Sequence, residues 1–244
     1  MMRALLALLL LLAAPAAWAE RRAALLVGES AGDQSDLPLK YAESDAAAVR
    51  EVLVQVGGVA PADVFLLRGA TAADLRTALA ATKQRLLEGG FGKGDRLLLY
   101  VSAHSSAGEL HLRGTRFPIT ELRAFVDAGI AGVTLLILDT CESGVAMRAK
   151  GLAPLAGPIV QLEKPSLSGS VVIASAGPDE SAFESDELGG SVFTQHFVAG
   201  LRGAADTSHD GRVTLQEAYT YAYARTVDSS ASLRTGRRGI SRPI

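Results

Sequence analysis

Short apolar runs alternate with segments of helical periodicity along most of the chain. Runs of this length, bounded by glycine or polar residues, are typical of strands that are buried on both faces of a sheet. Their alternation with helices predicts an α/β fold in which helices cover both faces of a parallel sheet. The predicted strands are residues 23–28, 64–67, 95–103, 133–138 and 171–175, and the predicted helices are residues 39–56, 71–88, 120–128, 191–201 and 214–227.

The remaining segments are polar or irregular. An alternating pattern at Glu109–Gly114 predicts a small hairpin strand, and Ala149–Ser170 predicts a long connection because it contains Gly, Pro and Ser without helical periodicity. Residues 229–244 lack a core-forming pattern and predict a poorly ordered tail. The sequence contains no internal repeat, so residues 20–228 are predicted to form one domain.

Residues 1–19 have the pattern of a secretory signal peptide. Arg3 supplies a positive start, Ala4–Ala14 is an apolar core, and Ala17-Trp18-Ala19 is a cleavage site of small residues at its first and last positions. The core is shorter than the roughly 20 apolar residues that span a bilayer, which disfavours the alternative of an uncleaved anchor. We therefore expect an exported protein, periplasmic or extracellular, with no membrane contact once the signal peptide is removed.

Charge and cysteine content narrow the classes of function. The chain carries 24 Lys and Arg against 26 Asp and Glu, a net charge of −2, which argues against nucleic acid or an anionic membrane surface as a partner. The single cysteine excludes a disulfide within the chain. A lone thiol in an exported protein is open to oxidation, so a chemical use explains Cys141 better than packing does, although a buried structural cysteine is the alternative.

Cys141 follows a predicted central strand. The run Val133–Leu138 continues into Asp139-Thr140-Cys141, and α/β proteins bind ligands at the carboxyl ends of parallel strands. An earlier predicted strand leads to His104, 37 positions upstream. If the two strands are neighbours, both side chains lie at one edge of the sheet, and the imidazole can take the thiol proton. A structural histidine is the alternative for His104. The other three histidines lack this context and are interpreted as structural or exposed: His111, His196 and His209.

A strand that ends in Ser-x-His and a later strand that ends in Asp-x-Cys-x-Ser-Gly together resemble the caspase-like cysteine peptidases. The run 139–144, Asp-Thr-Cys-Glu-Ser-Gly, is most similar to the metacaspase and bacterial caspase-domain branch. Residues 23–28 resemble the family's first strand, and residues 39–46 resemble its helix start. The resemblance implies an α/β caspase-like three-layer sandwich with a mostly parallel central sheet. It also implies a cysteine-type endopeptidase whose Cys141–His104 dyad requires no cofactor for catalysis.

The resemblance extends to the groups that stabilise an oxyanion, which in the family are backbone N–H groups of the nucleophile and of the residue after the histidine. The matching residues are Cys141 and Ser105. Family members usually have Gly at the positions of Ser105 and Ala103, and a positive φ at Ser105 would cost about 1 kcal/mol. The departure favours a second hypothesis, a catalytically impaired domain with a binding or regulatory role. An α/β-hydrolase fits less well, because its histidine would follow the nucleophile.

A preference for basic substrates is also implied. Metacaspase-like peptidases hold a basic side chain before the scissile bond with two aspartates, and the matching residues are Asp45 and Asp139. Paired carboxylates bind guanidinium or ammonium groups through charge-assisted hydrogen bonds. The expected partner is a peptide or protein with Arg or Lys before the cleaved bond. Alternatively, Asp45 is a solvated helix residue or cap, and Asp139 caps the turn that follows it.

The segment 206–217 has the spacing of a calcium-binding loop. Side chains with oxygen stand at loop positions 1, 3, 5 and 12, Gly at position 6 and an apolar residue at position 8. The candidate calcium ligands are Asp206, Ser208, Asp210, Arg212 and Glu217. The alternative needs no metal, because Thr214 and Glu217 also have the pattern of a capping box for the last helix. A calcium ion bound here is expected to be structural.

Overall fold

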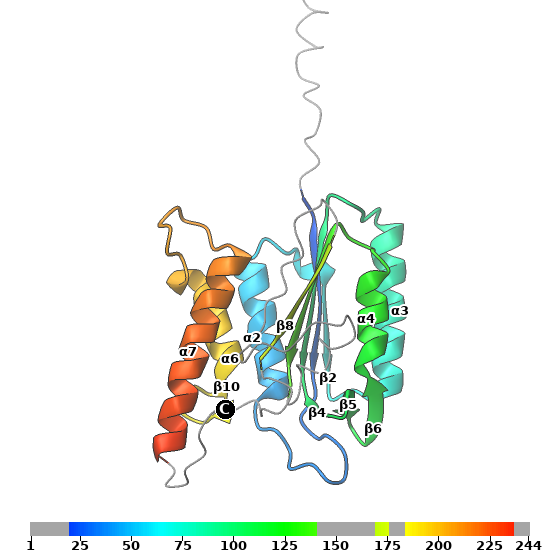
Figure 1. Cartoon of the computed structure of the whole chain (residues 1–244). Coiled ribbons are helices and arrows are strands. Elements are labelled where there is room, and N and C mark those ends of the chain that lie inside the picture. Colours follow the sequence, from blue (N-terminus) through cyan, green and yellow to red (C-terminus); the bar gives the residue numbers. More distant parts are fainter. Residues whose placement is uncertain (1–19, 141–168, 176–183, 237–244) are drawn as a thin grey trace, which may run out of the picture.

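A five-stranded sheet forms the centre of the computed structural model, which describes residues 20–140, 169–175 and 184–236 (Figure 1). The strand order is β2-β1-β3-β7-β8, and every neighbouring pair is parallel. The strands are β1 (Arg22–Gly28), β2 (Val64–Arg68), β3 (Arg96–Ser102), β7 (Val133–Asp139) and β8 (Gly169–Ala174). The sequence predicted each of these strands, and the α/β class is confirmed.

Helices cover both faces of the sheet, so the fold is the predicted three-layer sandwich (Figure 1). Side chains alternate between the faces along each strand. On β1, Leu25 and Val27 belong to one apolar core, and Ala24 and Leu26 belong to the other. The first core contains α3 (Ala72–Glu88) and α4 (Ile119–Asp127), and the second contains α2 (Ala42–Gln55), α6 (Val192–Ala199) and α7 (Leu215–Gly236).

Two small antiparallel units supplement the main sheet. One contains β4 (His104–Ser106), β5 (Glu109–Leu112) and β6 (Thr115–Pro118), and the other pairs β9 (Glu184–Ser185) with β10 (Gly190–Ser191). Only β5 was predicted, because strands of two to four residues are too short to show a period in the sequence. The remaining short elements are a 3-10 turn, η1 (Pro61–Asp63), and a π turn, η2 (Gly200–Ala204).

The last helix is longer than its sequence pattern predicted. α7 continues to Gly236, so residues 229–236 are helical, in the segment for which the sequence predicted a poorly ordered tail. Once a helix has been nucleated and packed, each added residue gains a hydrogen bond without a further nucleation cost, which explains the extension. The predicted signal peptide, residues 1–19, most of the connection 149–170 and residues 237–244 lie outside the described residues. Within the described part, no helix has the length and apolar character of a membrane span.

The register of the sheet aligns the strand ends that the sequence marked as functional. Gly28 pairs with Ser102, and Ser102 pairs with Asp139. β3 and β7 are therefore neighbours, as the dyad hypothesis requires. His104 follows Ser102 by two residues, and Cys141 follows Asp139 by two residues, so the two segments leave the sheet at the same level.

Candidate active site at the carboxyl edge of the sheet

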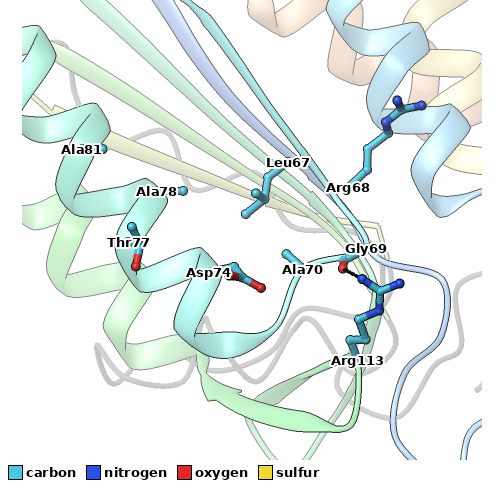
Figure 2. A pocket seen from close by; sticks show the side chains of 9 residues that line it. All are labelled: Leu67, Arg68, Gly69, Ala70, Asp74, Thr77, Ala78, Ala81 and Arg113. Atoms are coloured by element: carbon cyan, nitrogen blue, oxygen red, sulfur yellow. Dashed lines mark hydrogen bonds between the residues drawn. The ribbon is translucent and has the colours of Figure 1, made fainter.

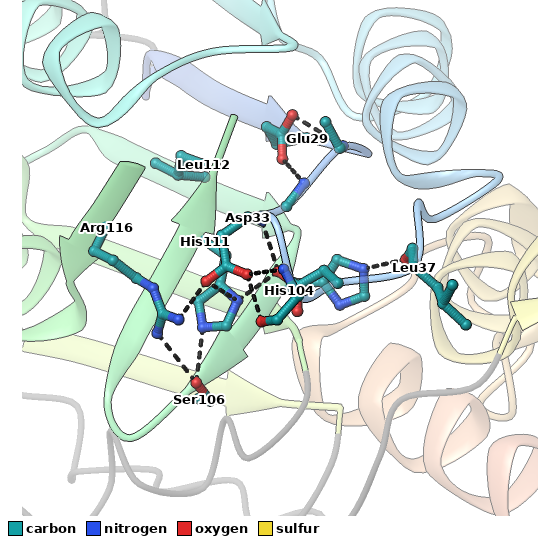
Figure 3. Close-up of polar contacts among 12 residues, drawn as sticks. Glu29, Asp33, Leu37, His104, Ser106, His111, Leu112 and Arg116 are labelled. Carbon is teal, nitrogen blue, oxygen red and sulfur yellow. Dashed lines mark hydrogen bonds and ion pairs between the residues drawn. The ribbon is translucent and has the colours of Figure 1, made fainter. Parts of the chain in front are cut away.

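His104 is held at the start of β4 by a backbone carbonyl from a distant loop. Its Nε2 atom lies 2.8 Å from the carbonyl oxygen of Leu37 (Figure 3). A carbonyl oxygen can only accept, so Nε2 carries the hydrogen and donates it. In the neutral ring Nδ1 is then the acceptor, which is the form a general base needs. Nothing in the sequence pattern pointed to Leu37, because its backbone and not its side chain makes the contact.

Cys141 itself lies outside the described residues. The chain that leads to it is described: Asp139 ends β7, and Thr140 is buried. The structure thus brings His104 and the strand that carries Cys141 to one edge, while the approach of the thiol to the imidazole stays a prediction.

Ser105 does not have the strained backbone that its substitution for Gly suggested. It lies in β4, where it pairs with Leu110, and it is buried. Among the described residues other than Gly, positive φ angles occur at Ala107, Arg113 and His209, and neither Ser105 nor Ala103 is among them. The energetic objection to an oxyanion donor at Ser105 therefore does not apply in this structure. The N–H of Cys141, the other predicted donor, is outside the described residues.

Asp45 lies in the first turn of α2 and is almost completely buried, with 1% of its surface exposed. Its Oδ2 accepts from the Ser191 amide at 2.8 Å, and its Oδ1 accepts from the Gln195 side chain at 2.9 Å. Burial raises the pKa of Asp45 to about 7, and the charge of Asp139 raises it further, against the effect of these hydrogen bonds. Both alternatives for Asp45 are wrong, since it is neither solvated nor the cap, a position that Tyr41 occupies.

Asp139 is the second buried carboxylate, with 3% of its surface exposed. Its Oδ2 accepts from the Thr194 hydroxyl at 2.6 Å, and the Thr194 oxygen, whose hydrogen is thereby used, accepts from the Tyr100 hydroxyl at 2.6 Å. Oδ1 of Asp139 has no hydrogen-bond partner among the described residues. Burial raises the pKa of Asp139 and, in the same region, raises the pKa of Tyr100 well above its ordinary value.

The β9–β10 hairpin packs on the start of α2 and encloses Asp45. Glu184 accepts from the Lys40 and Tyr41 amides at 3.0 and 2.9 Å, and Asp186 pairs with the Lys40 ammonium at 2.9 Å. Gly190 allows the close approach: a Cβ there would lie within 3.0 Å of Asp45 Oδ1 and of the Gln195 side chain. The sequence did not identify this hairpin as part of the site.

Three side chains beside His104 form a second polar cluster (Figure 3). The ligand atoms of Asp33, Asp36 and His111 lie within 4.8 Å of one another, a set that could hold a metal ion. Asp33 is, however, paired with Arg116, and Asp36 Oδ2 lies 2.6 Å from His111 Nδ1. Hydrogen bonds from Ser35 and Arg116 hold the pKa of Asp33 well below its usual range. For Asp36, burial raises the pKa, but hydrogen bonds from the Asp33 amide and His111 hold it below its usual value.

The predicted calcium loop has hydrogen bonds of its own. Asp206 Oδ2 accepts from the Gly211 amide at 3.0 Å, and Glu217 Oε2 accepts from the amide and hydroxyl of Thr214 at 2.9 Å. The Thr214 hydroxyl in turn accepts from the Glu217 amide at 3.2 Å, which completes the capping box. These hydrogen bonds lower the pKa of Glu217 to about 2. The capping alternative is thus observed, and calcium binding stays a prediction.

A hollow of about 470 Å³ lies between the end of β2 and α3 (Figure 2). Leu67, Ala78 and Ala81 give it an apolar wall, and Arg113 reaches across its rim to donate to the Gly69 carbonyl at 2.8 Å. None of the predicted site residues lines it. It therefore contributes no group to the site at the carboxyl edge.

Comparisons with known proteins agree with this fold. Residues 21–231 match a family model described as Caspase domain. The fold is similar to the crystal structure of caspase-1 from Spodoptera frugiperda, with a TM-score of 0.62 at 18% sequence identity; the match covers 84% of this chain and 76% of that chain. No curated protein matches the chain.

Proposed function

The chain belongs to the caspase domain family of cysteine peptidases, and from this premise we propose that it is an exported endopeptidase that cleaves after Arg or Lys. Cys141 is the nucleophile, and His104 is the base and later the acid. Asp45 and Asp139 bind the basic side chain before the scissile bond. Catalysis uses these side chains and backbone amides.

In the proposed mechanism His104 Nδ1 takes the proton of the Cys141 thiol, and the thiolate attacks the carbonyl carbon of the peptide bond. The backbone amides of Cys141 and Ser105 donate to the oxyanion that forms. The intermediate collapses when the C–N bond breaks, and His104 gives its proton to the leaving amine. Water, deprotonated by His104, then hydrolyses the thioester and regenerates the thiol. The hydrogen bond from Nε2 to the Leu37 carbonyl persists in both protonation states of the ring: it orients the imidazolium and fixes the tautomer of the neutral imidazole.

The observation that carries the substrate proposal is a pair of buried carboxylates without a cation. Within the described residues, neither Asp45 nor Asp139 forms an ion pair, and the groups that favour the charged form of Asp139 are neutral hydroxyls, those of Ser191, Thr194 and Ser175. The charge of Asp139 disfavours the ionised form of Asp45. A guanidinium or ammonium group supplies the missing donors and the missing positive charge, whereas an acidic side chain would add repulsion.

The decisive experiment assays the mature chain on matched peptides that differ only in Arg, Lys or Asp before the cleaved bond. We expect cleavage after Arg and Lys and none after Asp. Cys141→Ala and His104→Ala should each remove cleavage while the unfolding midpoint stays close to that of the wild type. Cleavage that persists in Cys141→Ala would contradict the mechanism. A folded wild type that cleaves none of the peptides would favour the alternative, a binding or regulatory domain.

Export and calcium binding are separate parts of the proposal. Trp18 is the only tryptophan and precedes the predicted cleavage site, so exported and processed protein should show no tryptophan fluorescence. Emission from recovered protein would instead support an uncleaved anchor.

Calcium is proposed as a structural ion at loop 206–217. It should raise the unfolding temperature of the wild type but not that of Asp206→Ala, and equal effects on both would contradict the site.

A further inference from the structure

The loop of residues 29–38 supplies the Leu37 carbonyl that holds His104, yet the side chain of Leu37 does not anchor this loop. That side chain is 86% exposed, so packing does not fix the position of its backbone. Pro38 follows and restricts Leu37 to extended conformations, which limits the directions that the carbonyl can take. The position of the carbonyl then depends on polar contacts of the residues on either side of Leu37, and on the following side the Leu39 amide donates to the Ser30 carbonyl at 2.8 Å.

Asp36, the residue before Leu37, is the main anchor on the preceding side. Its Oδ2 atom accepts from the Asp33 amide at 2.7 Å, and the Asp36 amide donates to the Asp33 carbonyl at 3.2 Å. Two hydrogen bonds between Asp33 and Asp36 thus close the turn 33–36. The same Oδ2 lies 2.6 Å from Nδ1 of His111. His111 belongs to β5 and is buried, and it pairs in register with His104 of β4.

Polar side chains surround His111 and form hydrogen bonds with both of its ring nitrogens (Figure 3). Arg116 donates to the Ser106 oxygen at 3.3 Å, which leaves the Ser106 hydrogen free for Nε2 of His111 at 2.7 Å. The carboxylate of Asp36 can only accept, so Nδ1 of His111 donates to it. Arg116 also pairs with Asp33. A neutral His111 satisfies every one of these contacts and links the β4–β6 unit to the turn before Leu37.

We infer that Asp36 and His111 are positioning residues of the peptidase: they hold the Leu37 carbonyl in place, and through it the imidazole of His104. The inference rests on the proposed Cys141–His104 chemistry. Neither residue touches the reacting atoms. His111, on the buried strand β5, fixes the carboxylate of Asp36. Asp36 in turn fixes the Leu37 carbonyl, which sets the tautomer and orientation of His104.

A metal ion bound by Asp33, Asp36 and His111 fits these contacts less well. Arg116 already forms an ion pair with Asp33, and Nδ1 of His111 already donates its hydrogen to Asp36. A metal would have to displace both the guanidinium and that hydrogen, because a metal-bound nitrogen carries none. Arg116 instead balances part of the negative charge that the two aspartates place beside the base.

The first test is kinetic and uses the mature chain with an Arg peptide. Asp36→Ala and His111→Ala should each lower kcat on the order of tenfold to a hundredfold, with KM within about twofold, because the base is displaced and the substrate pocket is not. The kcat of the double variant should be no lower than that of the less active single variant, since both residues act through the same carbonyl. Asp36→Asn should recover much of the loss, because its amide oxygen still accepts.

The matched control is Glu121→Ala, which removes an exposed ion pair with Arg76 between α3 and α4 and should leave kcat unchanged. Losses that add in the double variant would overturn the inference, and so would an unchanged kcat in Asp36→Ala. In Asp206→Ala protein, which lacks the proposed calcium site of loop 206–217, a kcat that falls after treatment with a chelator would overturn the inference in favour of a metal held by Asp33, Asp36 and His111.

The second test does not depend on activity. In Cys141→Ala protein, ¹⁵N signals of the His104 ring should show the hydrogen on Nε2, and adding Asp36→Ala should give a mixture of tautomers. Unchanged ring signals would overturn the inference even if kcat fell, because the loss would then have another cause. If the wild type proves inactive on every peptide, the proposed function fails, and the ring signals still decide whether Asp36 positions His104.

Discussion

The carboxyl edge of the sheet has two sides whose carboxylates have different partners. On the histidine side, which comprises loop 29–38 and β4–β6, Arg116 pairs with Asp33 and His111 bonds Asp36. On the aspartate side, which comprises Asp45, Asp139 and the groups around them, amides and hydroxyls are the only partners found among the described residues. On the histidine side Arg116 supplies one cation and His111 a hydrogen-bond donor, and we propose that these contacts orient the base. The aspartate side lacks a cation, and that deficit is what a basic substrate would remove.

The largest effect that tests this difference is expected from Asp45→Asn. An incoming Arg side chain would lose half of its charged partners, which should cost about 2 kcal/mol or more, at least a tenfold fall in kcat/KM on Arg peptides. Asp186→Asn is the matched control, because Asp186 is exposed and already paired with Lys40; its effect should be below about twofold. Normal cleavage by Asp45→Asn would show that the aspartate side does not bind the substrate.

Gly190→Ala should show how closely the β9–β10 hairpin fits over Asp45. The added methyl group would collide with Asp45 and Gln195, so we expect a loss of about 2 kcal/mol in the free energy of unfolding, measured with urea. Gly92→Ala is the control, because its Cβ would meet open space, and it should change stability by less than about 0.5 kcal/mol. Equal stability of the two variants would mean that the hairpin can move away from Asp45.

The pKa of Asp45 predicts how stability depends on pH. A rise from 3.8 to about 7 means that the folded protein binds an extra proton between these values, so this group makes the fold less stable as pH increases from about 4 to about 7. The Asp45→Asn variant has no carboxyl group at this position, so its stability lacks this dependence on pH. Relative to the wild type it should therefore gain on the order of 4 kcal/mol between pH 4 and pH 8, since each pKa unit corresponds to about 1.4 kcal/mol. Parallel curves for the two proteins in urea unfolding would contradict the raised pKa.

The smallest effect is expected from Tyr100→Phe. The change removes one donor from the buried Thr194 oxygen but leaves the Thr194 bond to Asp139 intact. We expect a loss of about 1 kcal/mol in the free energy of unfolding and unchanged selectivity for Arg over Asp peptides. A large change in selectivity would place Tyr100 in the substrate pocket.

The sequence by itself determined the sheet and the class of site. Apolar runs such as Val133–Leu138 need burial on both faces, and this requirement alone specifies strands with helices on either side. His104 and Cys141 were found because each follows such a run, and the register of β3 and β7 aligns the segments that carry them. Asp139 directly follows the same run as Cys141, so its place at this edge also follows from the sequence.

Only the tertiary structure decided which groups surround those residues. Leu37 acts through a carbonyl, which every residue possesses, and the role of Gly190 depends on Asp45, which is distant in the chain. The sequence did not single out His111, because its partners, Asp36 and Arg116, come together only when loop 29–38 lies against β4–β6. Periodicity reports which face of an element is buried, whereas hydrogen bonds between distant segments depend on packing that no local pattern records.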